Sequence, residues 1–517
     1  MPMNARLLRP RATGFNPKSI AGLSLWLDAS DASTLRQNSD GSVAATANGD
    51  PVGYWGDKSG NNHHLTQATA GLRGVVFTSS GRTRVDIPNT LNAGFASATS
   101  PTTSSTATVI QAARFQGAFG NWLTLLRGDG SAFFDAASSG AAISPNLTAG
   151  SPSYFVQGLP TTATRAALYS ALNEANAVLS VTNLDLSTWS SGWRYYNFGS
   201  SFQFTGEVGE VLVYNRALTA SERQRIEAYL ARKWSISLPP QVSNSEAQDW
   251  VNRVYANGGS VSASTASAVN TFCNAIDTAG IRDRFYRLNL LCGNSDAALV
   301  APRVPLYRGP SAGGTQYGNT IDTNLNFVAG DYAETGASGG LTGNGSTKAL
   351  RHGVLWSALP DINSVHLAAY TCTAGNSGSV LGAYWFHTTD AAQRTSWELF
   401  PSTATVGSTA GVTFPSGSLP ALLTASRVGS ASSFFYRGAT ASAESTVTGS
   451  VARQIESTVF ARNLVTGSPP AGGAYGETLY SSSRIGGYSL GAGMSGAQVT
   501  AYNNAMQAFQ TALARNA

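Results

Sequence analysis

The sequence predicts a mainly β protein built from two tandem antiparallel β-sandwiches, each closed by a C-terminal helix, with a short helical insertion between them. Three observations support this prediction. Short β-rich runs alternate with turn signals over most of the 517 residues, a spacing typical of sandwiches and barrels. No helical pattern before residue 206 is long enough to build parallel βαβ units. Both halves of the chain end in the same order of elements, which is a strand, a turn and an amphipathic helix.

The segment that closes the first half spans residues 206–234 and reads GEVGEVLVYNRALTASERQRIEAYLARKW. Its first nine residues are β-rich around Gly209. Thr219 and Glu222 have the spacing of a capping box, in which each side chain bonds the backbone amide of the other residue. The apolar residues that follow recur at helical spacing on one face. We therefore expect a strand followed by a helix that lies on a sheet.

The second half closes in the same way. Ser495 and Gln498 form another capping box before a helix that carries Val499, Met506 and Phe509 on one face. This ending predicts a second strand, turn and helix.

Two shorter helices are expected between the β-domains. Ser245 and Gln248 have capping-box spacing, and the helix they begin should reach about Tyr255. Ser262 can cap a second helix that extends to Asp277. We expect an arm over residues 1–18, a β-domain over 19–240, a helical segment over 241–280 and a second β-domain over 281–517.

Composition limits the class of protein. Charged residues make up 12% of the chain, which is about half of the usual share in soluble domains. The 10 Trp, 19 Tyr and 21 Phe residues argue against intrinsic disorder, and the 55 Gly residues are typical of a turn-rich β protein. A chain of this length should form two to four domains of about 100–200 residues each.

The positive charge is concentrated at the N-terminus. The net charge is +5, and four basic residues precede residue 19 with no acidic residue among them. The remaining chain is therefore nearly neutral, and no nucleic-acid-binding surface is expected. We predict that the arm is an anchor; the alternative is a frayed terminus without a role. The predicted anchoring residues are Arg6, Leu7, Leu8, Arg9, Arg11 and Lys18.

The sequence shows no targeting or membrane segment. No charged stretch precedes an apolar one as in a secretory signal, and no run of about 18 apolar residues could span a membrane. We expect synthesis in the cytoplasm and no membrane insertion. Cys273, Cys292 and Cys372 are odd in number, which argues against a disulfide framework, and their spacing is not that of a metal site.

Three segments of the first half carry a family resemblance. SLWLDASDAS, YWGDKSGNNHHLTQ and the closing segment resemble concanavalin A-like (laminin-G-like) jelly-roll modules, particularly those of phage and bacterial surface proteins. This resemblance covers residues 20–238. The ending RIGGYSLGAGMSGAQV is similar to a second jelly-roll module of phage virion proteins.

The resemblance implies a structural virion protein of a bacteriophage, a tail-fibre or decoration subunit attached by its arm. The expected partners are other virion proteins of the head, neck or tail, and further copies of the chain in a homo-oligomer such as a trimer. The expected location is the virion. A carbohydrate-binding adhesin or receptor-binding protein that recognises a host-surface glycan is the alternative, and a glycan hydrolase is a third hypothesis, because this fold serves all three.

Candidate catalytic residues are few. Glycan hydrolases of this fold need two facing carboxylates, and Glu207 and Glu210 are the nearest pair. Their odd separation places them on opposite faces of a regular strand, unless a bulge at Gly209 intervenes. His63 and His64 could act as metal ligands. Adjacent side chains on an extended segment point apart, however, so we expect a loop exposed to solvent instead. We therefore predict no enzyme activity, no metal and no cofactor.

One cluster of aromatic residues could bind a glycan. Trp189, Trp193, Tyr195 and Tyr196 lie close together in the sequence, and sugars stack on such rings. The alternative is that they fill the core of the sandwich, and the burial preferences of aromatic residues favour that interpretation.

Overall fold

The chain folds into two compact units, which meet in sequence at Leu238 and Pro239. The structure is a computed structural model. It describes residues 15–88, 93–115, 123–127, 133–136, 151–161, 164–173, 175–195, 197–198, 202–203, 205–386, 395–406, 412–430, 432–442, 454–466 and 474–516. Within these ranges, no helix is both long and apolar enough to cross a membrane.

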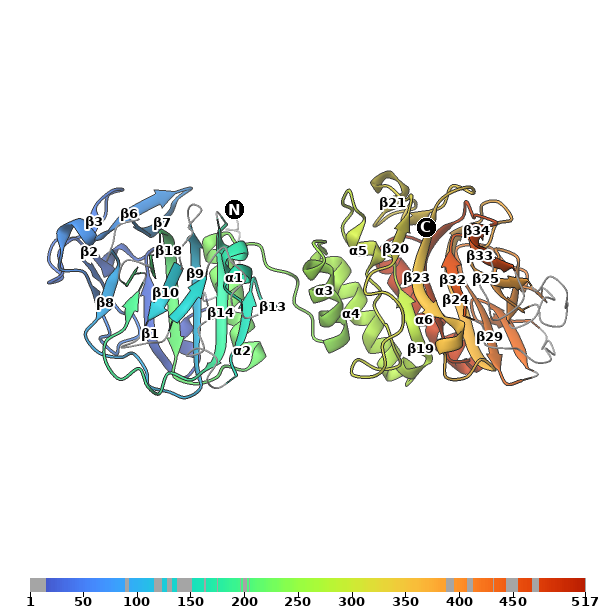
Figure 1. Cartoon of the computed structure of the whole chain (residues 1–517), viewed down its shortest axis with the longest axis horizontal. Helices are drawn as coiled ribbons and strands as arrows, with labels where there is room; N and C mark the ends of the chain where they lie inside the picture. The colour runs from blue at the N-terminus through green and yellow to red at the C-terminus, as the bar shows by residue number, and fades with distance from the viewer. Residues whose placement is uncertain are drawn as a thin grey trace, which may run out of the picture. The chain divides into compact units, whose positions relative to one another are not determined.

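The first unit is a sandwich of two antiparallel sheets (Figure 1). The larger sheet has nine strands, and β1 pairs with β18 outside the order β13-β12-β14-β9-β18-β7-β6-β3. Its strands are β1 (Leu23–Asp28), β3 (Pro51–Val52), β6 (Gly74–Ser79), β7 (Arg82–Ile87), β9 (Ala107–Phe115), β12 (Ser153–Val156), β13 (Leu159–Thr161), β14 (Ala177–Leu184) and β18 (Gly206–Tyr214). Two helices, α1 (Arg165–Leu172) and α2 (Ala220–Trp234), complete the unit.

The smaller sheet of the first unit has seven strands in the order β11-β10-β15-β8-β5-β4-β2. They are β2 (Leu35–Arg36), β4 (Tyr54–Trp55), β5 (Leu65–Thr66), β8 (Phe95–Ser97), β10 (Leu123–Arg127), β11 (Phe133–Ala136) and β15 (Arg194–Tyr195). Strands β16 (Asn197–Phe198) and β17 (Phe202–Gln203) form a separate hairpin. Side chains from both sheets, such as Leu25, Trp55 and Val109, form one buried core.

Strand β18 organises the larger sheet. One edge of β18 pairs with β9, and the other pairs first with β7 and then with β1. Helix α2 follows and packs against β9 and β14. It begins at the predicted capping box of Thr219 and Glu222 and ends at Ser235, whose φ is +53°.

The second unit also consists of two sheets, with the core between them. The first sheet contains β19 (Phe285–Asn289), β21 (Tyr332–Ala333), β22 (Gly340–Thr342), β24 (Ser364–Thr373), β29 (Ala421–Val428), β30 (Ser433–Arg437), β31 (Thr440–Ala441) and β35 (Arg484–Gly491). The second contains β20 (Thr323–Leu325), β23 (Ala349–Leu355), β25 (Leu381–Phe386), β26 (Thr395–Leu399), β27 (Thr403–Val406), β28 (Val412–Thr413), β32 (Glu456–Val459), β33 (Arg462–Thr466) and β34 (Ala474–Thr478). The sheets are antiparallel except for the parallel pair β25 and β33.

Helices cover the first sheet of the second unit (Figure 1). They are α3 (Ser245–Ala256), α4 (Ala263–Thr278), α5 (Val300–Arg303) and α6 (Gly496–Ala512). The Ser262 cap of α4 and the Ser495–Gln498 capping box of α6 are confirmed. The predicted cap of α3 is wrong by one residue, because the Asn244 side chain accepts the first amide hydrogen bonds and Ser245 is already helical.

The two units share a central arrangement. In the second unit β35 takes the place of β18, because one edge pairs with β24 and the other pairs first with β22 and then with β19. Each closing strand leads into a helix with a capping box. The mainly β class and the two closing helices are therefore confirmed.

The contacts of the helical segment and of the N-terminal residues show to which unit each belongs. The helical segment over residues 241–280 is part of the second unit, because α3 and α4 share a core with β19 and α6. At the N-terminus, Pro17 is buried and its carbonyl accepts a hydrogen bond from the Tyr214 hydroxyl at 3.1 Å. The Phe15 ring packs against Tyr229. Residues 15–18, predicted to belong to the arm, therefore contact the first sandwich.

Candidate functional site

The bulge that could bring Glu207 and Glu210 together is present. Along β9 the partner of Glu207 is Arg114 and the partner of Glu210 is Ala112, and the register shifts between Val208 and Glu210. Residues 112 and 114 lie on one face of β9, and cross-strand partners share a face. Both carboxylates therefore lie on the outer face of the sheet, at the end covered by α2.

The indole of Trp234 separates the two carboxylates. A Cβ atom at Gly209 would lie 2.7 Å from this ring, so the bulge leaves no space for a larger residue. The Trp234 Nε1–H donates to Glu210 Oε2 at 3.1 Å, while the Arg84 guanidinium lies 5.5 Å from the centre of the Trp234 ring.

Glu210 is fully buried and surrounded by donors. Its carboxylate accepts hydrogen bonds from Trp26 Nε1 at 2.7 Å and from the Tyr229 hydroxyl at 2.8 Å, and it pairs with Lys233 Nζ at 2.6 Å. Burial and the nearby charge of Asp28 raise its pKa, while Lys233 acts against them. With no exposed surface and four donors bound, this carboxylate has the environment of a structural group.

Asp28 completes this network from strand β1. It pairs with Lys233 at 2.6 Å and with Lys58 at 2.8 Å. Burial would raise the pKa of Asp28, but the charge of Lys233 and hydrogen bonds from Lys233 and Lys58 hold it below its usual value. Lys58 also pairs with Asp31 at 2.8 Å, so two partly exposed lysines and three carboxylates form one cluster.

Glu207 is held by arginines. Its oxygens lie 3.1 Å from Arg84 Nη1 and 3.1 Å from Arg114 Nη1, and the side chain is 1% exposed. Glu210 has no exposed surface. Glu207 lines a small pocket of about 240 Å³ together with Arg84 and Arg114, but these arginines hold both of its oxygens, unlike the free carboxyl group that a hydrolase acid or nucleophile presents. The geometry of both carboxylates supports a structural role.

The three segments that carry the family resemblance meet in one place. Asp28 and Trp26 come from the first segment, Lys58 from the second, and Glu210 and Lys233 from the third. Asp57 of the second segment accepts hydrogen bonds from the backbone amides of Trp26 at 2.9 Å and His63 at 3.0 Å. These contacts therefore connect β1, the loop after β4, β18 and α2 within the first sandwich.

The adjacent histidines point to different partners, as predicted. His63 Nδ1 lies 3.0 Å from Thr99 Oγ1, and His64 Nδ1 accepts a hydrogen bond from the Asp57 amide at 3.0 Å. Among the described residues, no group of three or more His, Cys, Asp or Glu side chains could hold a metal ion.

The predicted aromatic cluster lies in the core. Trp189, Trp193 and Tyr195 are 1%, 0% and 1% exposed. The rings of Trp189 and Trp193 meet edge to face with centroids 5.1 Å apart. No ring face of these three residues is open to a sugar, which agrees with the core interpretation. Tyr196 lies outside the described residues.

The predicted anchoring residues are mostly outside the described part of the chain. Arg6, Leu7, Leu8, Arg9 and Arg11 belong to residues 1–14, and Lys18 is exposed at the start of the first unit.

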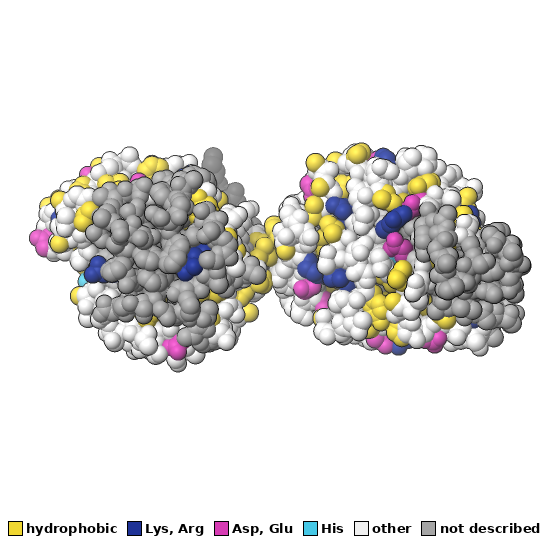
Figure 2. Space-filling view, in the orientation of Figure 1, with side chains coloured by type: hydrophobic (Ala, Val, Ile, Leu, Met, Phe, Trp, Pro, Cys, Tyr) yellow, Lys and Arg dark blue, Asp and Glu magenta, His cyan; other side chains and the backbone are white. Residues whose placement is uncertain are grey.

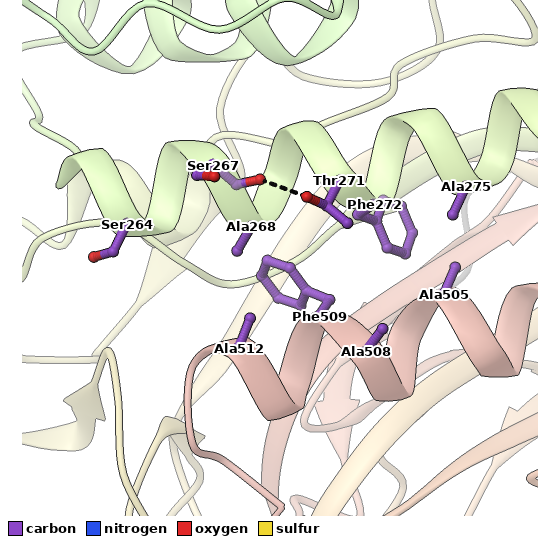
Figure 3. Close-up of a pocket in the computed structure, with 10 residues that line it drawn as sticks. All are labelled: Ser264, Ser267, Ala268, Thr271, Phe272, Ala275, Ala505, Ala508, Phe509 and Ala512. Atoms are coloured by element: carbon purple, nitrogen blue, oxygen red, sulfur yellow. Dashed lines mark hydrogen bonds between the residues drawn. The ribbon is translucent and has the colours of Figure 1, made fainter.

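An apolar pocket of about 290 Å³ lies between α4 and α6 of the second unit (Figure 3). Phe272 and Phe509 project into the space between the two helices, and small side chains such as Ala268, Ala508 and Ala512 also line the pocket. No lining residue is ionisable, so the pocket offers shape and apolar surface but no acid–base chemistry. Figure 2 shows that charged side chains are sparse on the visible described surface of both units.

The arginines around Glu207 were not predicted. Arg84 lies on β7, and Arg114 is the last residue but one of β9. Only the pairing of β18 with both strands brings them to one carboxylate, and no local signal in the sequence indicates that pairing.

Comparison with known proteins yields little. No protein-family model matches the chain, and no curated protein matches it. Among solved structures, the sialidase of Trypanosoma rangeli in complex with sialic acid matches at a TM-score of 0.24 and 15% identity, over 41% of this chain and 33% of the sialidase chain. A mutant of that sialidase with trans-sialidase activity matches at a TM-score of 0.20 and 14% identity, with the same coverage. The matched part thus spans about a third of the sialidase, and similarity at this level indicates nothing about activity.

Proposed function

We propose that this chain is a non-catalytic structural subunit of a bacteriophage particle, of the fibre or decoration type. Its arm attaches it to other virion proteins, and its two β-sandwich units are displayed from the particle. The observation that supports this proposal is the meeting of the three family-like segments in one buried network around Asp28 and Glu210. The segments on which the resemblance rests therefore lie together in the folded unit.

The ion pairs made by the two carboxylates support the non-catalytic part of the proposal. Glu207 and Glu210 lie on one face, but each is buried and paired with basic side chains. Both oxygens of Glu207 are held by arginines, and removal of one partner from such a pair would leave a buried charge without compensation.

Quantitative mass spectrometry of density-purified phage particles tests the proposal. We expect the chain to co-migrate with the major capsid protein in a fixed ratio across the particle fractions. Its presence only in the soluble part of the host lysate would contradict the proposal.

A further inference from the structure

A polar pocket of about 450 Å³ lies on the outward face of the smaller sheet in the first unit. Leu35 and Trp55 point into the core and are 0% exposed. Side chains alternate along a strand, so the neighbouring Arg36 and Tyr54 point outward, and these two residues are cross-strand partners. Both line the pocket together with His64 from the loop after β4.

Two rings form one wall of the pocket. The Tyr54 and His64 rings lie with centroids 5.1 Å apart and planes inclined by 35°. The Asp57 amide donates to His64 Nδ1 at 3.0 Å, which places the ring proton on Nε2. His64 is therefore held in one orientation and offers a hydrogen-bond donor from Nε2.

Several polar groups of the pocket have no protein partner. Within the described residues, neither the Arg36 guanidinium, the Tyr54 hydroxyl nor His64 Nε2 makes a hydrogen bond or ion pair. Asp40 accepts from the Ser42 amide at 2.8 Å and from the Ser42 hydroxyl at 2.6 Å, both through Oδ1. Its Oδ2 atom is left as an acceptor. The pocket therefore presents donors and an acceptor beside an aromatic surface.

The loop residue beside the Tyr54 ring edge, Gly41, has no side chain. Gly41 has a φ of +82°, and a Cβ atom there would contact Tyr54 Cε2 at 3.8 Å. A larger residue would be strained in this backbone conformation and would extend over the ring edge.

We propose that this pocket binds one pyranose residue of a saccharide. The apolar face of a sugar ring suits the tyrosine ring, while neighbouring hydroxyls suit the planar guanidinium of Arg36 and the carboxylate of Asp40. The three residues predicted from sequence to bind a glycan, Trp189, Trp193 and Tyr195, are buried elsewhere in the same unit. This inference goes beyond the proposed function and does not depend on it, because saccharide binding and incorporation into particles are measured separately.

Saturation-transfer NMR on the full chain tests the site. The probes are the methyl glycosides of glucose, galactose, N-acetylglucosamine and glucuronic acid. We expect saturable binding of at least one glycoside with a Kd on the order of 1 mM, which is typical of a ligand of this size. Tyr54→Ala should abolish the signal, and Arg36→Gln should weaken binding about tenfold, by the loss of one charged hydrogen-bonding group.

His63→Ala is the matched control, because His63 adjoins His64 but does not line the pocket. Its binding should equal that of the unmodified chain. If Tyr54→Ala fails to fold, Tyr54→Phe and Arg36→Gln decide the outcome, and either one weakening the binding supports the site. Absence of saturation transfer from all four glycosides overturns the proposal, as does binding that is unchanged in the folded pocket variants.

Discussion

Trp234 joins helix α2 to strands β18 and β7 of the larger sheet through three different interactions. Its ring covers Gly209 at the bulge, its indole N–H donates to Glu210, and Arg84 lies against its face. The side chain is 1% exposed. One residue therefore provides apolar burial, satisfies a buried carboxylate and supports a buried guanidinium.

Trp234→Ala should strongly destabilise the first unit. Loss of a buried Trp side chain costs about 3–5 kcal/mol, and the variant also removes one donor from Glu210. We expect a lower melting transition for the first unit in calorimetry, with the transition of the second unit unchanged. An unchanged transition for the first unit would contradict the role assigned to Trp234.

His366 should make the second unit sensitive to acid. The side chain is fully buried between the Ala492 carbonyl at 2.8 Å and the Ser489 hydroxyl at 3.0 Å. Burial lowers its pKa from 6.5 to about 4. Between these values the unfolded chain binds a proton that the folded chain does not, so stability should fall as the pH drops from about 6.5 toward 4. The expected loss is about 3 kcal/mol.

Chemical denaturation at a series of pH values measures this effect. His366→Asn removes the titrating group, so its unfolding free energy for the second unit should fall less over the same pH range. The slope of unfolding free energy against pH is compared between the unmodified chain and His366→Asn. The difference between the two slopes isolates His366 from other buried groups such as His352 and Glu398, whose pKa values are also shifted. Equal slopes would show that His366 does not contribute.

At the scale of elements, the bulge at Gly209 fits α2 to the sheet. It turns Glu207 and Glu210 to one face and leaves room for the Trp234 ring. The helix and its capping box are predictable from local residues, because the box depends on Thr219 and Glu222, which are three positions apart in the sequence. The bulge is not, because a glycine within a β-rich run is also compatible with a regular strand.

Gly209→Ala should therefore destabilise the first unit by about 1–3 kcal/mol, because the added methyl group meets the Trp234 ring. Gly71→Ala is the matched control, since a Cβ atom at Gly71 meets nothing within 4 Å. Melting temperatures of the two variants measure the difference. A Gly209→Ala chain as stable as Gly71→Ala would show that the ring moves aside without cost.

At the scale of the whole molecule, the two units repeat one plan. A central closing strand has one long neighbour and two short ones, and a capped helix follows it. The sequence predicts this repetition because both endings carry the same local signals. It does not predict how distant strands pair, so the convergence of Arg84 and Arg114 on Glu207 emerges only from the folded chain. The burial of Trp189 and Trp193 agrees with the core interpretation that their residue type favours.

The purified protein should not hydrolyse polysaccharides. Glu207 and Glu210 are paired and buried, so we expect no release of reducing ends from capsular or cell-wall polysaccharides. Glu207→Gln should likewise change stability and not turnover. Measurable hydrolysis that disappears in a folded Glu207→Gln variant would overturn the non-catalytic proposal.

We expect the N-terminal arm to attach the chain to the particle. Residues 1–14 contain Arg6, Arg9 and Arg11 and no acidic residue, which suits an extended segment in an acidic groove of another virion protein. Deletion of residues 1–14 retains Phe15 and Pro17, which contact the first sandwich. We therefore expect a folded, soluble two-unit protein that no longer joins the particle.

Two comparisons separate attachment from folding. Deletion of residues 1–18 also removes Phe15 and Pro17, so it should lower the melting temperature of the first unit, whereas deletion of 1–14 should not. Replacing Arg6, Arg9 and Arg11 with Gln keeps the length of the arm but removes its charge, and it should reduce incorporation measured by mass spectrometry of purified particles. Normal incorporation of the 1–14 deletion would place attachment on the sandwich units themselves, where the uncharged pocket between α4 and α6 is the first surface to test.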